Sequence, residues 1–185
     1  RSSLLIAVPS SIGLIVLGYP IIQTLLERGA FSEESTRLTV ATMQWYALGL
    51  TAMCASKVLT NTFYALHDTW TPVRSAGIAL GMNVVLNLFL VFPMQLPGLA
   101  LATSLSSTWN SLHLYRLLSR RLGPFDPAFK KWGSRLLLAS LGMAGVCLGV
   151  WWCGIRLFGL HNNGLALLWL FITIASAVFG FFVSA

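Results

Sequence analysis

The strongest constraint on this chain is a series of six apolar stretches, each long enough to cross a lipid bilayer. A transmembrane helix needs about 20 mostly apolar residues to span the hydrocarbon core. Only 9% of the 185 residues are charged, against roughly 25% in a soluble domain, so the chain lacks the polar surface that water requires. We therefore predict an all-α, polytopic transmembrane helix bundle. The predicted spans are residues 3–26, 38–66, 72–92, 98–118, 136–155 and 165–185.

Helix start and stop signals divide the spans into groups. Thr71 before Pro72 places a capping hydroxyl ahead of proline at the first helical position. Pro93 and Pro97 bracket a short turn without charge. A basic loop predicted at 123–135 contains glycine and two prolines. It separates four helices in residues 1–122 from a final pair in residues 136–185.

The distribution of basic residues predicts the orientation. The net charge of +7 does not indicate nucleic-acid binding, because the basic residues flank apolar runs instead of lining one solvated face. If the spans alternate, eight bases fall on one side and three on the other, and Lys57 lies within a span. Cytoplasmic loops carry the excess of Lys and Arg, so both ends of the segment are predicted to be cytoplasmic. The eight are Arg1, Arg74, Arg116, Arg120, Arg121, Lys130, Lys131 and Arg135, and the three are Arg28, Arg37 and Arg156.

Lys57 is the most unusual residue of the predicted spans. A lysine at the centre of a transmembrane helix costs roughly 2.5–3.5 kcal/mol on insertion scales, so it is expected to face a cavity or a partner. Asn61 lies one turn further on the same face, and Gln44 lies toward the start of the span. One interpretation is a polar strip along a substrate path. The other is that backbone carbonyls satisfy Lys57, or that it extends to the cytoplasmic interface.

Asn83 and Asn87 form an i, i+4 pair in the third predicted span and are further candidates for a substrate path. Polar side chains between membrane helices more often hold the helices together, at about 0.6 kcal/mol each, and we favour that structural interpretation. Glycine pairs with the GxxxG spacing, which permits close helix approach, occur in the third and fifth spans. These pairs are Gly77 with Gly81 and Gly145 with Gly149.

Catalytic and metal-binding patterns are missing from the sequence. The three cysteines fit no zinc or redox spacing, the three histidines are scattered, and no HExxH, GxSxG or phosphate-binding glycine loop occurs. All five acidic residues lie at helix ends or in loops, so these spans hold no carboxylate for proton or sodium coupling. We predict that the chain is not an enzyme and requires no metal or cofactor.

Several short motifs occur along the first four predicted spans and their turns. They are 27–32 (ERGAFS), 57–59 (KVL), 63–65 (FYA), Asp68, 71–73 (TPV) and 98–105 (GLALATSL). In this order and spacing they closely resemble the MurJ/MviN family of lipid II flippases, which belongs to the multidrug/oligosaccharidyl-lipid/polysaccharide exporter superfamily. The match covers about the first 120 residues, and the last two spans match in position and hydropathy.

The resemblance implies a fourteen-helix transporter with two six-helix lobes and two extra C-terminal helices, of which these six spans are the ninth to fourteenth. Its expected activity is transport of undecaprenyl-linked peptidoglycan precursor by alternating access. The substrate would be a lipid-linked saccharide, and an N-terminal lobe would be the partner. The last helix pair resembles a lipid-facing groove, for which Leu137, Trp151, Trp152 and Trp169 are candidates. Among the motif residues, Arg28, Gly29, Asp68 and Pro72 are interpreted as turn or interface residues.

Other functions stay open at this point. The leading expectation is the C-terminal part of a lipid II flippase in the bacterial cytoplasmic membrane, surrounded by membrane lipids. A related polysaccharide-lipid flippase or drug exporter is the first alternative, and a non-transporting scaffold in cell-wall synthesis is the second. The chain begins with Arg1 and stops inside an apolar run, so we expect it to be a piece of a longer protein.

Overall fold

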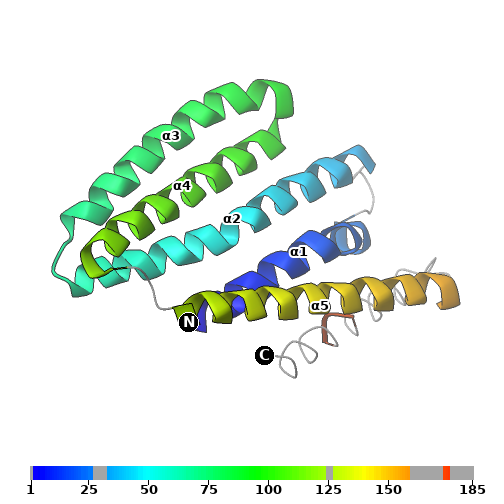
Figure 1. Ribbon diagram of the computed structural model, residues 1–185. Coiled ribbons are helices and arrows are strands. Elements are labelled where there is room, and N and C mark those ends of the chain that lie inside the picture. The colour runs from blue at the N-terminus through cyan, green and yellow to red at the C-terminus, as the bar shows by residue number, and fades with distance from the viewer. Residues whose placement is uncertain (1, 27–32, 124–126, 159–172, 176–185) are drawn as a thin grey trace.

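The computed structural model describes residues 2–26, 33–123, 127–158 and 173–175, and everything regular in this part is helical (Figure 1). Five helices coincide with the first five predicted spans, which confirms the predicted all-helical fold. The sixth predicted span lies almost wholly outside the described residues, so the count of six stays a prediction. The helices are α1 Ser2–Leu26, α2 Glu33–Ala65, α3 Trp70–Met94, α4 Leu96–Leu122 and α5 Pro127–Phe158.

Two helix boundaries differ from the prediction. Helix α5 begins at Pro127, so most of the segment 123–135 that we predicted as a loop is helical. Proline is favoured in the first turn of a helix, where its missing N–H costs nothing. Helix α3 runs through Pro93 to Met94, and α4 contains Pro97 in its first turn. Gln95 alone joins them, with a φ of 53°.

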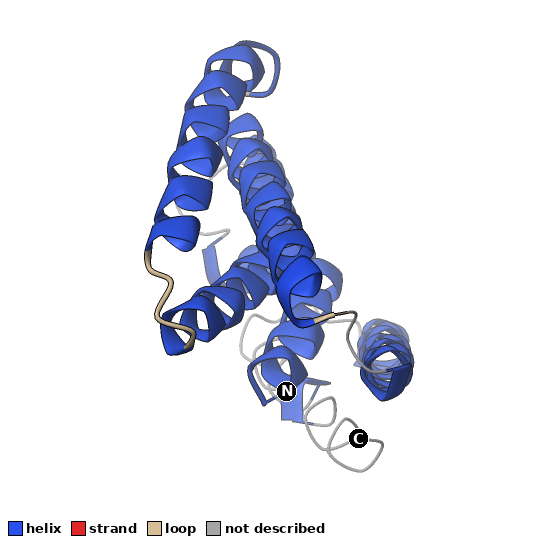
Figure 2. Cartoon of the chain, turned by 60° about the vertical axis from the view of Figure 1, so that its left-hand side comes forward, coloured by secondary structure: helices blue, strands red, loops and turns tan. Residues whose placement is uncertain are grey.

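The helices pack in a chain of neighbours, α3 on α4, α4 on α2, α2 on α1 and α1 on α5 (Figure 2). Helices α2 and α4 run parallel. Ser104 meets the backbone of Trp45 near their starts, and Leu114 and Leu118 meet Phe63 near their ends. Helix α3 returns antiparallel along α4. This order leaves one side of α2 and most of α3 without a neighbour in the described part of the chain.

Three apolar clusters hold the helices together. Phe63, Leu114 and Leu118 are fully or almost fully buried between α2 and α4. Val8 packs with Leu136, and Leu17 with Cys147, which fixes α1 parallel to α5. Packing of this kind is what membrane helices rely on, because lipid tails are as apolar as the side chains.

The closest helix contacts occur at glycines other than those with the GxxxG spacing. A Cβ on Gly49 of α2 would lie 2.8 Å from the Cα of Ser104, and one on Gly98 would lie 2.8 Å from the carbonyl carbon of Leu90. Gly77 and Gly81, by contrast, have open space where a Cβ would stand, as have Gly145 and Gly149. Within the described residues, the GxxxG spacing therefore does not mark a close helix contact at these four glycines.

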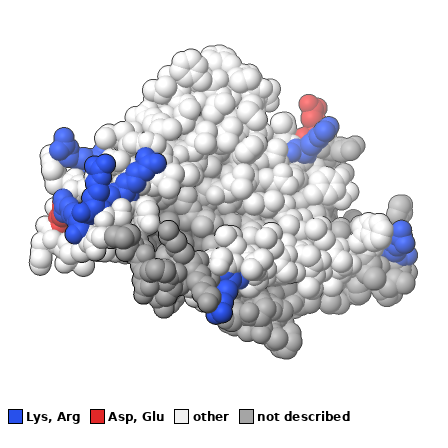
Figure 3. Space-filling view, viewed as in Figure 1, with Lys and Arg blue, Asp and Glu red and all other residues white. Residues whose placement is uncertain are grey.

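Three helices of the described part are long and apolar enough to cross a membrane, namely Ser3–Gln23, Trp70–Met94 and Trp132–Val150. Helices α2 and α4 contain more polar residues but are longer, at 33 and 27 residues. The alternating helix directions place the described bases of each predicted group at the expected helix ends. In Figure 3 most visible Lys and Arg side chains gather where α3 begins and α4 ends. Which end faces the cytoplasm stays a prediction.

Candidate functional site: the uncovered face of helix α2

One face of α2 is exposed along most of the helix and carries polar side chains. Residues at i, i+7, i+11, i+15 and i+18 share this side of a helix. Gly49 and Phe63 face α4, and Thr51 faces α1 through its contact with Ser11. The uncovered side lies between these two contacts. We call it the α2 polar face, and it consists of Tyr46, Met53, Lys57, Asn61 and Tyr64.

Lys57 and Asn61 sit one helical turn apart on this face, as the sequence predicted. Both side chains are exposed, and neither has a hydrogen-bond or ion-pair partner among the described residues. By register with α4, Lys57 lies between the midpoint of the helix pair and its basic end, since Gly49 meets Ser104 and Phe63 meets Leu114. The ammonium group has three donors and a positive charge, so this face is suited to an anionic or oxygen-rich partner.

The other predicted path residues point elsewhere. Gln44 donates from Nε2 to the backbone oxygen of Ile15, 3.2 Å away, and so joins α2 to α1. Asn83 donates from Nδ2 to the hydroxyl of Ser106 on α4 at 3.1 Å, and Asn87 donates to Oδ1 of Asn83 at 2.9 Å. Gln44 and Asn83 therefore connect helices, whereas the Asn87 bond stays within α3. The five candidates therefore do not form one cluster, and Lys57 with Asn61 is the pair that the fold leaves open.

A second polar group, which sequence reasoning missed, joins α3 to α4. The hydroxyl of Ser75, only 1% exposed, donates to Oδ1 of Asn110 at 2.7 Å and lies 2.9 Å from Nδ1 of His113. The His113 ring stacks on Trp109, with ring centroids 4.8 Å apart. A lone serine in an apolar run gives no signal of this kind. His113, one of the three scattered histidines, is a partner in this interhelical contact.

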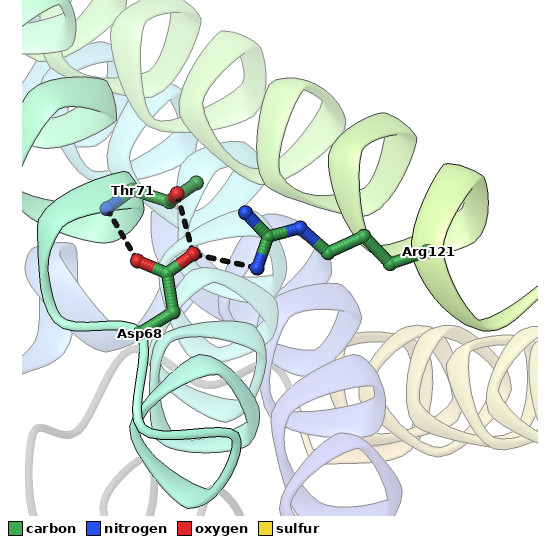
Figure 4. Close-up of polar contacts among 3 residues, drawn as sticks. All are labelled: Asp68, Thr71 and Arg121. Atoms are coloured by element: carbon green, nitrogen blue, oxygen red, sulfur yellow. Dashed lines mark hydrogen bonds and ion pairs between the residues drawn. The ribbon is translucent and has the colours of Figure 1, made fainter.

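The turn between α2 and α3 is held by Asp68 (Figure 4). Its carboxylate accepts hydrogen bonds from the Thr71 N–H at 3.0 Å and the Thr71 hydroxyl at 2.7 Å, and pairs with Arg121 of α4 at 2.6 Å. The Thr71 N–H, then its hydroxyl, then Arg121 lower the pKa of Asp68 from 3.8 to about 2. The capping acceptor is therefore Asp68, and the predicted capping role of the Thr71 hydroxyl is wrong, because that hydroxyl donates.

The remaining predicted residues divide between described and undescribed parts. Leu137 is exposed on α5, and Trp152 is exposed with the Arg156 guanidinium 4.2 Å from its ring centroid. Pro72 is buried in the first turn of α3. The part of the chain that the structure describes contains no group of three or more His, Cys, Asp or Glu able to hold a metal. Arg28, Gly29, Trp169 and the side chain of Trp151 lie outside the described residues.

Comparison with known proteins identifies the family to which this helical chain belongs. The family model "Lipid II flippase MurJ" matches residues 1–174 of the 185. The chain belongs to the lipid II flippase MurJ family. By its name this is a family of transporters rather than enzymes, and the resemblance predicted from the motifs is confirmed.

Individual relatives agree with the family model. The chain is 36% identical over 115 residues to a probable lipid II flippase MurJ of Rickettsia prowazekii, covering 62% of this chain and 23% of that protein. The protein of the same description from Haemophilus influenzae is 33% identical over 153 residues, covering 82% and 29%. A solved structure of lipid II flippase MurJ in an inward closed conformation superposes with a TM-score of 0.77 at 28% identity, covering 98% of this chain and 35% of that one. The chain thus spans about a quarter to a third of its relatives' length.

Proposed function

We propose that the chain is the C-terminal part of a lipid II flippase, and that the α2 polar face lines the path of the lipid-linked peptidoglycan precursor. The main support for this proposal is that Lys57 and Asn61 are exposed on a membrane helix without a partner in the described structure. Facing lipid tails, the lysine would cost roughly 2.5–3.5 kcal/mol. A water-filled path, or the rest of a longer transporter, removes this cost.

The chemistry of the face suits the proposed substrate. A lipid-linked precursor carries a diphosphate between its polyprenyl chain and its sugars, and a lysine ammonium is a common phosphate binder. Asn61 offers both an amide donor and a carbonyl acceptor, which match sugar hydroxyls. Alternating access requires a second wall to close the path. We propose that the other lobe of a two-lobed transporter supplies this wall, and the relatives' greater length supports that proposal.

The proposed location is the bacterial cytoplasmic membrane, with both ends of the segment in the cytoplasm and membrane lipid around the helices. The basic ends of α3 and α4 support this orientation through the positive-inside rule. Leu137 and Trp152 are exposed on α5 and are available for the proposed lipid-facing groove. Gln44 and Asn83 have a place in the path only if their interhelical hydrogen bonds open during transport, and Asn87 only if its bond to Asn83 within α3 opens.

The test is complementation in bacteria depleted of their own lipid II flippase, with the complete gene that encodes this chain. We expect rescue by the unchanged protein, loss of rescue with Lys57→Ala at normal membrane abundance, and partial rescue with Lys57→Arg, because the charge is kept. Leu80→Ala is the matched control, since Leu80 is 65% exposed on α3 and carries no polar group.

Each outcome has a defined meaning. Full rescue by Lys57→Ala would remove the α2 polar face from the substrate path while leaving the flippase itself intact. Failure of the unchanged, well-expressed protein to rescue would contradict the flippase proposal. It would favour a related flippase for another lipid-linked saccharide, a drug exporter of the superfamily, or a scaffold.

A further inference from the structure

Three arginines with no acidic partner in the described structure lie near one end of the α3–α4 pair. Arg74, Arg116 and Arg120 are all exposed. The neighbouring Arg121 differs, because it is paired with Asp68 and lies over the Phe63 ring at 5.6 Å. The fold thus uses one arginine of this group for structure and leaves three positive charges without a described counter-ion.

The three arginines lie at similar positions along the axis of the α3–α4 pair. Arg116 and Arg120 are four residues apart and therefore lie on one side of α4. Arg74 is next to Ser75, whose hydroxyl contacts His113, and His113 precedes Arg116 by three residues. The arginines consequently lie within a few helical turns of one another, at the end where Figure 3 shows the basic side chains gathering.

From each arginine toward the middle of the membrane, the helix exposes a row of apolar side chains. On α3, Ile78 and Val85 follow Arg74 at i+4 and i+11, and both are more than half exposed. On α4, Leu112 and Leu105 precede Arg116 by the same two spacings and are exposed as well. These spacings keep the residues on the face that carries each arginine. The surface is positive at one end and apolar from there toward the middle of the membrane.

We propose that this surface binds an anionic phospholipid, with its phosphate on Arg74, Arg116 and Arg120 and its acyl chains along α3 and α4. The occupant follows from charge complementarity. Arginine forks fit phosphate oxygens, and the apolar side chains below them suit the acyl chains of the same lipid. The site is separate from the α2 polar face, because Leu114 and Leu118 turn toward α2 whereas Arg116, two residues from each, lies on the opposite side of α4. The bound lipid is therefore a resident partner and not the transported substrate, and the proposal does not depend on the flippase assignment.

The experiment measures lipid binding to the complete purified protein by native mass spectrometry, with phosphatidylglycerol and with zwitterionic phosphatidylethanolamine as probes. The variants are Arg74→Gln, Arg116→Gln and Arg120→Gln, singly and combined. Each arginine near a membrane surface is expected to contribute about fivefold to anionic-lipid affinity. We therefore expect each single variant to lower the affinity for the first bound phosphatidylglycerol molecule several-fold. The triple variant should bind phosphatidylglycerol and phosphatidylethanolamine with equal affinity.

Arg135→Gln is the matched control. Arg135 is an exposed arginine on α5 at the same end of the molecule, since Leu136 packs on Val8 near the start of α1. If Arg135→Gln lowers the affinity for phosphatidylglycerol as much as the three test variants do, the electrostatic attraction is diffuse and the site is disproved. Unchanged preference in the single variants would also overturn it. The single variants decide the question if the triple variant does not fold.

Discussion

Helices α2 and α3 both expose a long face, but the two faces differ in chemistry. The exposed face of α3 is apolar through its middle, whereas the α2 polar face carries a lysine, an asparagine and two tyrosines. Both helices belong to the same membrane protein, and both are held on α4. The exposed apolar residues along the middle of α3 are Ile78, Leu80, Val84, Val85, Leu88 and Phe89.

The difference indicates two environments. A face of hydrocarbon side chains is stable in contact with lipid tails and needs no protein cover. A face with an unpaired ammonium and an amide is costly in lipid, so it is stable only beside water or polar partners. Under our proposal, exposure has two meanings in this structure: membrane contact for α3, and a path or a lobe contact for α2.

Adding a charge to each face tests this comparison and gives the largest expected effect. Val84→Asp places a carboxylate in the middle of the exposed α3 face, at a cost of about 2.5–3.5 kcal/mol. Met53→Asp places the same group on the α2 polar face, one turn before Lys57, where the proposed path would offer water and the Lys57 ammonium to stabilise it. We expect the membrane abundance of Val84→Asp to fall several-fold, and that of Met53→Asp to stay near the unchanged protein, by quantitative immunoblot. Equal losses would mean that both faces contact lipid.

A second prediction concerns where helices approach closely. Gly49→Ala brings a methyl group against Ser104 on α4, and relief requires the helices to separate. Overpacking of this kind destabilises by about 1–3 kcal/mol. Gly77→Ala on the open face of α3 is the matched control, because no atom lies within 4 Å of the new Cβ. Heat-induced unfolding of the complete protein in detergent should show a lower midpoint for Gly49→Ala alone. A lower midpoint for Gly77→Ala as well would indicate that α3 is covered after all.

The contrast between GxxxG spacing and real contact shows what the sequence lacks. Spans were predictable because hydropathy and length are properties of one segment, and the five described helices follow them. Contact between helices is a property of two segments. Gly77 and Gly81 have the spacing without a neighbour among the described residues, whereas Gly49 has the neighbour without the spacing.

The same reasoning applies to the polar residues. Lys57 and Asn61 were identified because a charge in an apolar run is conspicuous, and the fold leaves them on one open face. Gln44 and Asn83 look equally polar in the sequence, but their hydrogen bonds to other helices depend on packing. Ser75 and His113 gave no signal, since serine is common in membrane helices and the partner is 38 residues away.

Removal of an interhelical hydrogen bond should have a smaller effect than either change above. Asn83→Ala loses the bond to Ser106 and the bond from Asn87. Such bonds contribute about 0.6 kcal/mol each on average, so we expect a modest fall in the unfolding midpoint. Asn61→Ala, which removes an amide without a described partner, should leave the midpoint unchanged. A fall with Asn61→Ala would show that the α2 polar face makes structural contacts in the complete protein.

The smallest expected effect concerns Asp68, in the turn between α2 and α3, and it depends on pH. Because the folded-state pKa of Asp68 is about 2, against 3.8 without the fold, the ionised carboxylate stabilises the folded form above pH 4. This contribution is lost as the pH falls from about 4 toward 2, where the folded carboxylate takes up its proton. Asp68→Asn should lower the unfolding midpoint slightly between pH 5 and 8, and the difference from the unchanged protein should shrink below pH 4. The ion pair with Arg121 is partly exposed, and surface pairs contribute little. A difference that persists at pH 2 would show that Asp68 acts through its shape and hydrogen bonding rather than its charge.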